Sequence, residues 1–74
     1  MRDRAKELQL AADQFNVLAP IGTKVRICKG AIHHPDAKWI DSEVIEPGAF
    51  VMGGHSVMVK VPGDSIAVGH VEIV

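Results

Sequence analysis

The alternation of apolar and polar residues changes once along the chain, close to Pro20. Beyond that point Val57, Val59 and Val61 recur at every second position, the spacing that places side chains on one face of a β-strand. Pro62-Gly63 follows directly, and Pro-Gly is a preferred centre of a type II turn because glycine tolerates a positive φ. The last third of the chain therefore predicts short antiparallel strands joined by tight turns.

Two earlier stretches also predict strands. The segment 24–28 alternates apolar and polar side chains, with Val25 and Ile27 on one face and Cys28 on the outward face. Residues 38–45 contain Trp, Ile and Val, which are typical of strands.

The turns and the end of the chain complete this pattern. Pro47-Gly48 is a second candidate for a type II turn. Two short apolar runs, 66–68 and 71–74, are separated by Gly69-His70, where we expect a single 3₁₀ turn. We therefore predict a mainly β fold, a small five- to six-stranded antiparallel SH3-like barrel, over residues 20–74.

Before Pro20 the apolar residues follow a helical period instead. Pro20 disfavours helical geometry at the residue before it, so the helix should end by about Val17 or Leu18. Asn16 falls on the polar side. We predict an N-terminal amphipathic helix within residues 1–19, packed on the barrel as part of one folding unit. Its apolar stripe consists of Ala5, Leu8, Ala12, Phe15 and Ala19.

Composition narrows the class of protein. A chain of 74 residues is one domain with a small core, so a homodimer or higher oligomer is the default expectation. The net charge of −1 provides no global basic field that would attract nucleic acid or an anionic membrane. The single Cys28 excludes an internal disulfide and fits a reducing compartment. Because no secretory leader or membrane-length apolar run is present, we expect a cytoplasmic protein that does not bind a membrane.

The histidines do not have the spacing of a metal site. His33 and His34 are adjacent, so on an extended backbone they point to opposite sides. No Cys-x-x-Cys or His-x-x-x-His spacing accompanies them, and we predict no metal and no cofactor. His55 and His70 are expected near one rim of the barrel, where they would bond loop carbonyls.

The candidate nucleophile and carboxylates do not predict an enzyme. Cys28 beside Lys29 lacks a positioned base and an oxyanion site, so we expect an ordinary strand thiol. Asp41 and Glu43 share a strand face, but a glycosidase also needs a long cleft for its substrate. We predict that the protein is not an enzyme.

Several pieces of the sequence together resemble a family of small proteins encoded by bacterial phages, prophages and mobile elements. These pieces are Phe15-Asn16, the run Pro20-Ile-Gly-Thr-Lys-Val-Arg26, Gly53-Gly54-His55 before the valine strand, and Ile66-Ala-Val-Gly-His-Val-Glu72. The pattern is approximately F-N-x3-P-[VI]-G-T-x-V-R, G-G-H and I-A-[LV]-x-H-V-E. The resemblance implies a mobile-element origin and no particular activity.

We interpret the chain as a non-enzymatic phage or mobile-element binding module that occupies a host or element protein stoichiometrically, for example to block a host or defence complex. Its expected contact residues are Lys29, His33, His34, Asp36, Lys38, Trp39, Asp41 and Glu43. One alternative is a barrel that binds nucleic acid, in which Trp39 stacks on a base. The residues for that alternative are Lys24, Arg26, Lys29, Lys38 and Trp39. A second alternative is a self-assembling structural or assembly factor.

Overall fold

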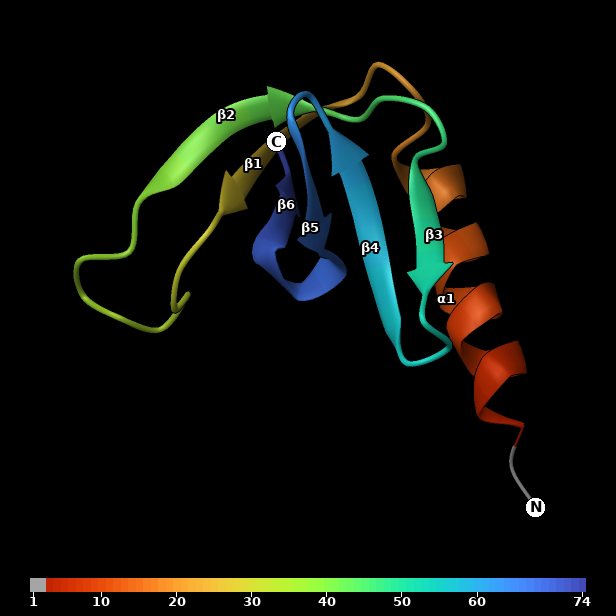
Figure 1. The fold of residues 1–74 in the computed structure, drawn as a ribbon. Coiled ribbons are helices and arrows are strands. Elements are labelled where there is room, and N and C mark those ends of the chain that lie inside the picture. Colours follow the sequence, from red (N-terminus) through yellow and green to blue (C-terminus); the bar gives the residue numbers. More distant parts are fainter. Residues whose placement is uncertain (1–2) are drawn as a thin grey trace.

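The computed structural model describes residues 3–74, so the first two residues of the predicted helical segment lie outside it. The described residues form one α-helix and six short strands, whose arrangement is shown in Figure 1. The predicted mainly β fold with one N-terminal helix is therefore confirmed. The elements are α1 (Arg4–Leu18), β1 (Lys24–Cys28), β2 (Trp39–Glu43), β3 (Ala49–Met52), β4 (Ser56–Val61), β5 (Asp64–Ala67), the 3₁₀ turn η1 (Val68–His70) and β6 (Val71–Ile73).

Helix α1 is defined by a cap at each end. The Asp3 side chain accepts a hydrogen bond from the Lys6 N–H at 3.2 Å, which satisfies one free donor of the first turn. The Ala19 N–H donates to the Phe15 oxygen, and the helix ends at Leu18 as predicted, ahead of Pro20.

One side of α1 packs on β3 and β4. Ala12 and Ala19 are completely buried there, and Leu8 and Phe15 pack against the same core. Ala5 is exposed, so the apolar stripe begins one turn later than the sequence predicts.

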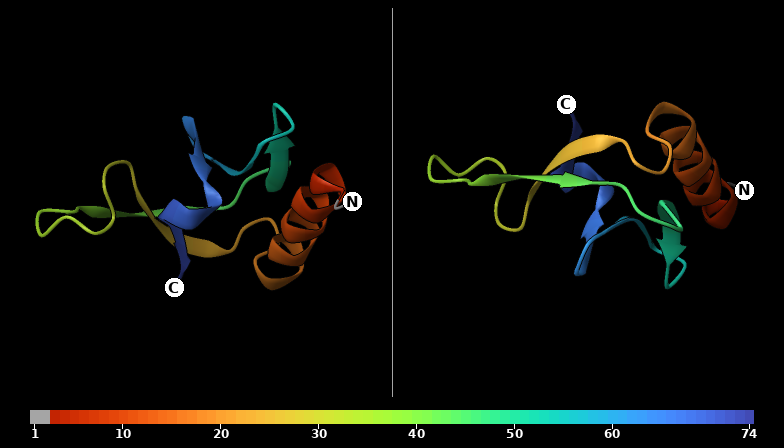
Figure 2. Two further views of the ribbon diagram at one scale, coloured as in Figure 1. Left: turned by 90° about the horizontal axis from the view of Figure 1, so that it is seen from below. Right: turned by 90° about the horizontal axis from the view of Figure 1, so that it is seen from above.

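The strands form two antiparallel three-stranded sheets, in the orders β2-β1-β6 and β3-β4-β5. The predicted closed barrel is wrong, because within residues 3–74 no ladder of hydrogen bonds joins the two sheets. The connection from β2 to β3 is instead attached to β4: the Ile45 N–H donates to the Lys60 oxygen, and the Lys60 N–H donates to the Gly48 oxygen. Figure 2 shows the β1–β2 hairpin and its loop at the end of the molecule away from α1.

The core lies between the two sheets and α1. Val57, Val59 and Val61 are all buried, which confirms the predicted phasing of β4. Val25 and Ile27 of β1 are also buried. The remaining core side chains are Ala12, Ala19, Val44, Ala49 and Ile66.

Two of the three turns predicted from the sequence are observed as predicted. Pro62-Gly63 joins β4 to β5 with Gly63 at φ +81°, as a type II turn requires. The predicted 3₁₀ turn is η1. The third turn differs: the Glu46–Pro47 bond is cis and the Gly48 N–H donates to the Ile45 oxygen, so the turn runs from Ile45 to Gly48 and Pro47-Gly48 is not its centre.

Candidate functional site

The β1–β2 hairpin presents two different faces. Its register pairs Ile27 with Ile40 and Val25 with Ser42, so these side chains share the face toward the second sheet. The opposite, outer face is charged. On it, Lys24 and Arg26 of β1 lie across from Glu43 and Asp41 of β2, and Glu72 of β6 lies across from Arg26.

The charges on the outer face are arranged in columns. The central strand β1 contributes the cations, and the flanking strands β2 and β6 contribute the acids. Lys24 Nζ lies 3.7 Å from a Glu43 carboxylate oxygen, and the Arg26 guanidinium donates to Glu72 at 2.9 Å. Asp41 is exposed and forms no ion pair within the described chain, although Arg26 stands opposite it. The β2 column therefore includes one carboxylate without a bound cation.

The free edge of β2 exposes backbone groups. The Val44 N–H donates to the Thr23 oxygen at 3.0 Å, so the backbone of Val44 faces β1. Because this direction alternates along a strand, Ser42 and Ile40 also face β1. The N–H and C=O groups of Trp39, Asp41 and Glu43 consequently point away from the sheet. The only strand beside β2 is β1, so among the described residues no strand pairs with these groups.

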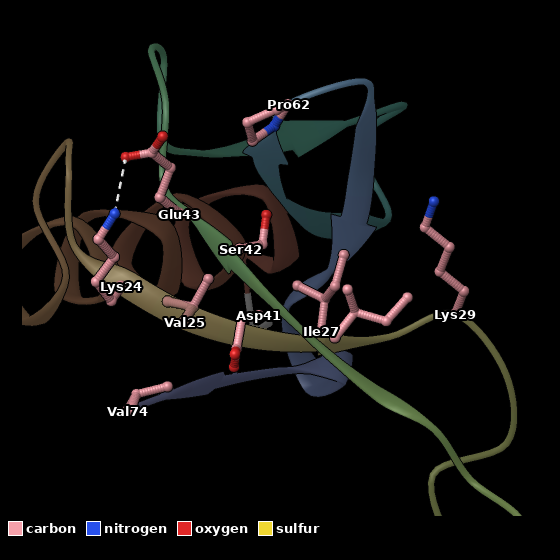
Figure 3. Close-up of a pocket in the computed structure, with 10 residues that line it drawn as sticks. Lys24, Val25, Ile27, Lys29, Asp41, Ser42, Glu43, Pro62 and Val74 are labelled. Carbon is pink, nitrogen blue, oxygen red and sulfur yellow. Dashed lines mark ion pairs between the residues drawn. The ribbon is translucent and has the colours of Figure 1, made fainter.

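An open groove of about 740 Å³ runs beside this hairpin (Figure 3). Val25 and Ile27 of β1 lie at its base, Ile40 of β2 is half exposed within it, and Pro62 of the β4–β5 turn lies across from them. The full lining is Lys24, Val25, Ile27, Lys29, Ile40, Asp41, Ser42, Glu43, Pro62 and Val74. An apolar base with polar groups around it suits a side chain from an extended peptide.

At one end of the groove, Lys29 connects the two sheets. Its Nζ lies 3.5 Å from an oxygen of Asp64, the first residue of β5. The Ser65 N–H, which donates to Asp64 at 2.8 Å, lowers the pKa of the Asp64 carboxyl; slight desolvation raises that pKa, and the Lys29 charge lowers it further. Asp64 is therefore an ionised partner for Lys29 at neutral pH.

The structure brings together only part of the predicted contact set. Lys29, Asp41 and Glu43 are among the residues that line the groove. Trp39 is not, although it shares the outer face of β2 with Asp41 and Glu43. The exposed loop contains the remaining members, His33, His34, Asp36 and Lys38. Within it His34 Nδ1 accepts a hydrogen bond from the Asp36 N–H at 3.1 Å.

The residues expected to bind nucleic acid are largely engaged with one another. Lys24, Arg26 and Lys29 each form an ion pair with a carboxylate. The Arg26 guanidinium carbon lies 5.7 Å from the centroid of the Trp39 ring, on which a base was expected to stack. Of that set, Lys38 alone has neither an ion pair nor a ring contact within residues 3–74.

The other two histidines, His70 and His55, each make one hydrogen bond within the fold. His70 Nδ1 lies 3.0 Å from the Cys28 oxygen; because a carbonyl only accepts, the nitrogen donates. His55 Nδ1 lies 2.8 Å from the Ser56 hydroxyl. Within residues 3–74 no group of three or more His, Cys, Asp or Glu side chains is placed to hold a metal ion.

Cys28 is buried, although it shares a strand face with Lys24 and Arg26 and lies across from Trp39, so the exposure expected for its side chain is wrong. It ends β1, and its Sγ lies 3.7 Å from the Gly30 oxygen. The expectation followed from strand alternation alone, which gives the face on which a side chain lies but not whether other parts of the fold cover it.

The contacts of three residues in the fold were missed from the sequence. Pro62 and Val74 line the groove, and Asn16 is fixed to β3 rather than solvated. The pairing of β6 with β1 brings Val74 to the hairpin, because the Val74 N–H donates to the Lys24 oxygen at 3.3 Å. Alternation within a strand could not reveal these positions, since they depend on which strands pair.

No protein-family model matches this sequence, and no curated protein or solved structure matches it either. Among the described residues, no helix has both the length and the apolar character needed to cross a bilayer.

Proposed function

We propose that this chain is a non-enzymatic binding module that takes up an extended segment of another protein along β2. The observation that carries this proposal is the free edge of β2, whose outward N–H and C=O groups adjoin an apolar groove. A peptide strand added to a sheet edge gains main-chain hydrogen bonds, and pockets for alternate side chains provide selectivity. Binding would occupy the partner stoichiometrically.

Solvent exposure along the hairpin supports this use of β2. Ile40 is 51% exposed, although it shares a face with the buried Ile27. An added strand would extend the sheet and cover Ile40 with one of its own apolar side chains. Within the described residues, Ile40 has a cross-strand neighbour on one side only, Ile27 of β1.

The fold class and origin of the module form part of the same proposal. We infer an SH3-like topology: the β3-β4-β5 meander, the single 3₁₀ turn η1, and the return of β6 to β1 support it. The resemblance of the Phe15–Val74 segment to phage and mobile-element proteins supports a partner from a bacterial host or from the element.

The test is a titration of ¹⁵N-labelled protein with a short peptide that alternates threonine and valine. We expect shifts along β2 and slower exchange of the Asp41 and Glu43 amides. Asp41→Pro removes one outward N–H at a position that an edge strand tolerates, and should abolish binding while the protein stays folded. Binding that survives in this variant, or shifts confined to other elements, would refute the proposal.

The same titration with a single-stranded oligonucleotide tests the nucleic-acid alternative. Shifts centred on Lys38 and Trp39 that vanish with added salt would favour that alternative over a protein partner.

A further inference from the structure

The charge columns of the first sheet indicate what kind of segment β2 accepts. Glu72 on β6 is followed by the cations of β1 and by the acids of β2, so a strand added beside β2 continues this alternation only if it carries cations. Opposite charges directly across neighbouring strands stabilise their pairing, whereas like charges destabilise it. Asp41 has no ion pair within residues 3–74, so its carboxylate is available to a cation on such a strand.

We propose that the partner is a basic, amphipathic extended segment, with Lys or Arg opposite Asp41 and Glu43 and an apolar side chain opposite Ile40. This inference rests on the proposed function of β2. Because side chains alternate along a strand, the residues opposite Asp41 and Glu43 would lie on the outer face, and the residue opposite Ile40 would lie on the groove face. The segment would therefore alternate basic and apolar residues.

The same pattern disfavours a second copy of this chain as the occupant. Both free edges of the sheet carry acids, Asp41 and Glu43 on β2 and Glu72 on β6. Edge-to-edge pairing of two copies would bring these acidic columns together. Charged edge strands are a common device by which proteins avoid such self-association.

The test compares two peptides of equal length, one alternating lysine and valine and the other alternating glutamate and valine. At low salt we expect the lysine peptide to bind the protein roughly tenfold more tightly or better, because two cross-strand pairs change sign between the peptides. The preference should shrink as salt rises, since these charges are exposed. Amide shifts along β2 identify the binding site in each titration.

Two variants with the same change in net charge separate this inference from a general charge effect. Asp41→Lys should remove or invert the preference, because it changes the β2 column directly. Asp13 lies on the exposed surface of α1, so Asp13→Lys should leave the preference for the lysine peptide unchanged. Circular dichroism of both variants checks that each remains folded.

The outcomes also separate this inference from the proposed function. Equal affinity for both peptides, a preference for the glutamate peptide, or an equal response of both variants would refute the basic segment and leave β2 as a binding edge. If neither these two peptides nor the threonine–valine peptide shifts the β2 amides, the proposed function itself fails.

Discussion

The Asn16 side chain bonds both backbone groups of Ala49. Its Nδ2 donates to the Ala49 oxygen at 3.0 Å, and its Oδ1 accepts from the Ala49 N–H at 2.8 Å. Residues 33 positions apart are thereby joined, and helix α1 is fixed at the start of β3. Such a contact mimics the pairing of an additional strand while using only one side chain.

Replacing Asn16 with alanine should lower the free energy of unfolding by about 1–3 kcal/mol, because the Ala49 N–H and C=O lose their partners in a part-buried site. Urea denaturation measures this loss. Gln14→Ala, on the exposed surface of the same helix, is the matched control and should change stability by less than about 0.5 kcal/mol. Equal effects of the two substitutions would show that the Ala49 contact contributes little.

Gly48→Ala should destabilise the protein for two reasons. Gly48 has φ +75°, and an added Cβ would lie 2.5 Å from Asn16 Oδ1. Gly63→Ala is the control, because Gly63 has a similar φ of +81° but no atom within 4 Å of the added Cβ. We expect roughly 1–2 kcal/mol for the conformation in both variants, with about 1–3 kcal/mol more at position 48 for the close contact.

The two substitutions around this contact should not be additive. In Asn16→Ala the atom that the new Cβ would meet is gone, so adding Gly48→Ala should then cost only what Gly63→Ala costs. An additive double variant would indicate that the backbone conformation alone, and not the contact with Asn16, determines the loss.

The alternation of apolar and polar residues predicted much of this fold. The predictions that failed depend on which strands and helices contact one another. Val57, Val59 and Val61 could be placed correctly because a period of two is a local property of a strand. Asn16 was assigned to the solvated side of the helix, because its bonds to Ala49 depend on where β3 lies. Local pattern identifies faces, whereas long-range contacts decide which faces and edges are covered.

The candidate site was likewise predictable only in part. Asp41 and Glu43 could be named from the sequence, because two acids at alternate positions share a strand face. The free edge of β2 could not be predicted, since a meander that closed into a barrel would have covered it. The open arrangement of the two sheets leaves that edge exposed.

Val59→Asp should unfold the protein, because the completely buried side chain would be replaced by a charge without a partner. Val17→Asp introduces the same chemistry on α1 where the side chain is 81% exposed, and should leave the protein folded. Circular dichroism and thermal melting compare the two variants. A cooperative melt for Val59→Asp near that of the unmodified chain would contradict the observed phasing of β4.

The pKa of the Asp64 carboxyl should lie below the ordinary value for aspartate. The Ser65 N–H contributes most to the lowered pKa, and the Lys29 charge contributes less. Because the folded pKa is lowered, the stabilisation linked to Asp64 is present above the unfolded pKa and is lost as pH falls through the folded pKa. NMR titration of the carboxyl carbon measures the pKa, and Lys29→Gln should raise it only in part, because the Ser65 hydrogen bond remains. A titration at the usual aspartate pKa would refute the Ser65 contact.

Amide exchange along β2 should alternate. The Ile40 and Ser42 amides face β1 and should exchange slowly, whereas those of Asp41 and Glu43 face outward and should exchange faster by on the order of tenfold or more after correction for intrinsic rates. The central strand is the internal control: β1 has a neighbour on each side, so Val25 and Arg26 should both be slow. Slow exchange at Asp41 in the free protein would mean that the β2 edge is already covered, and a peptide could then bind there only by displacing whatever covers it.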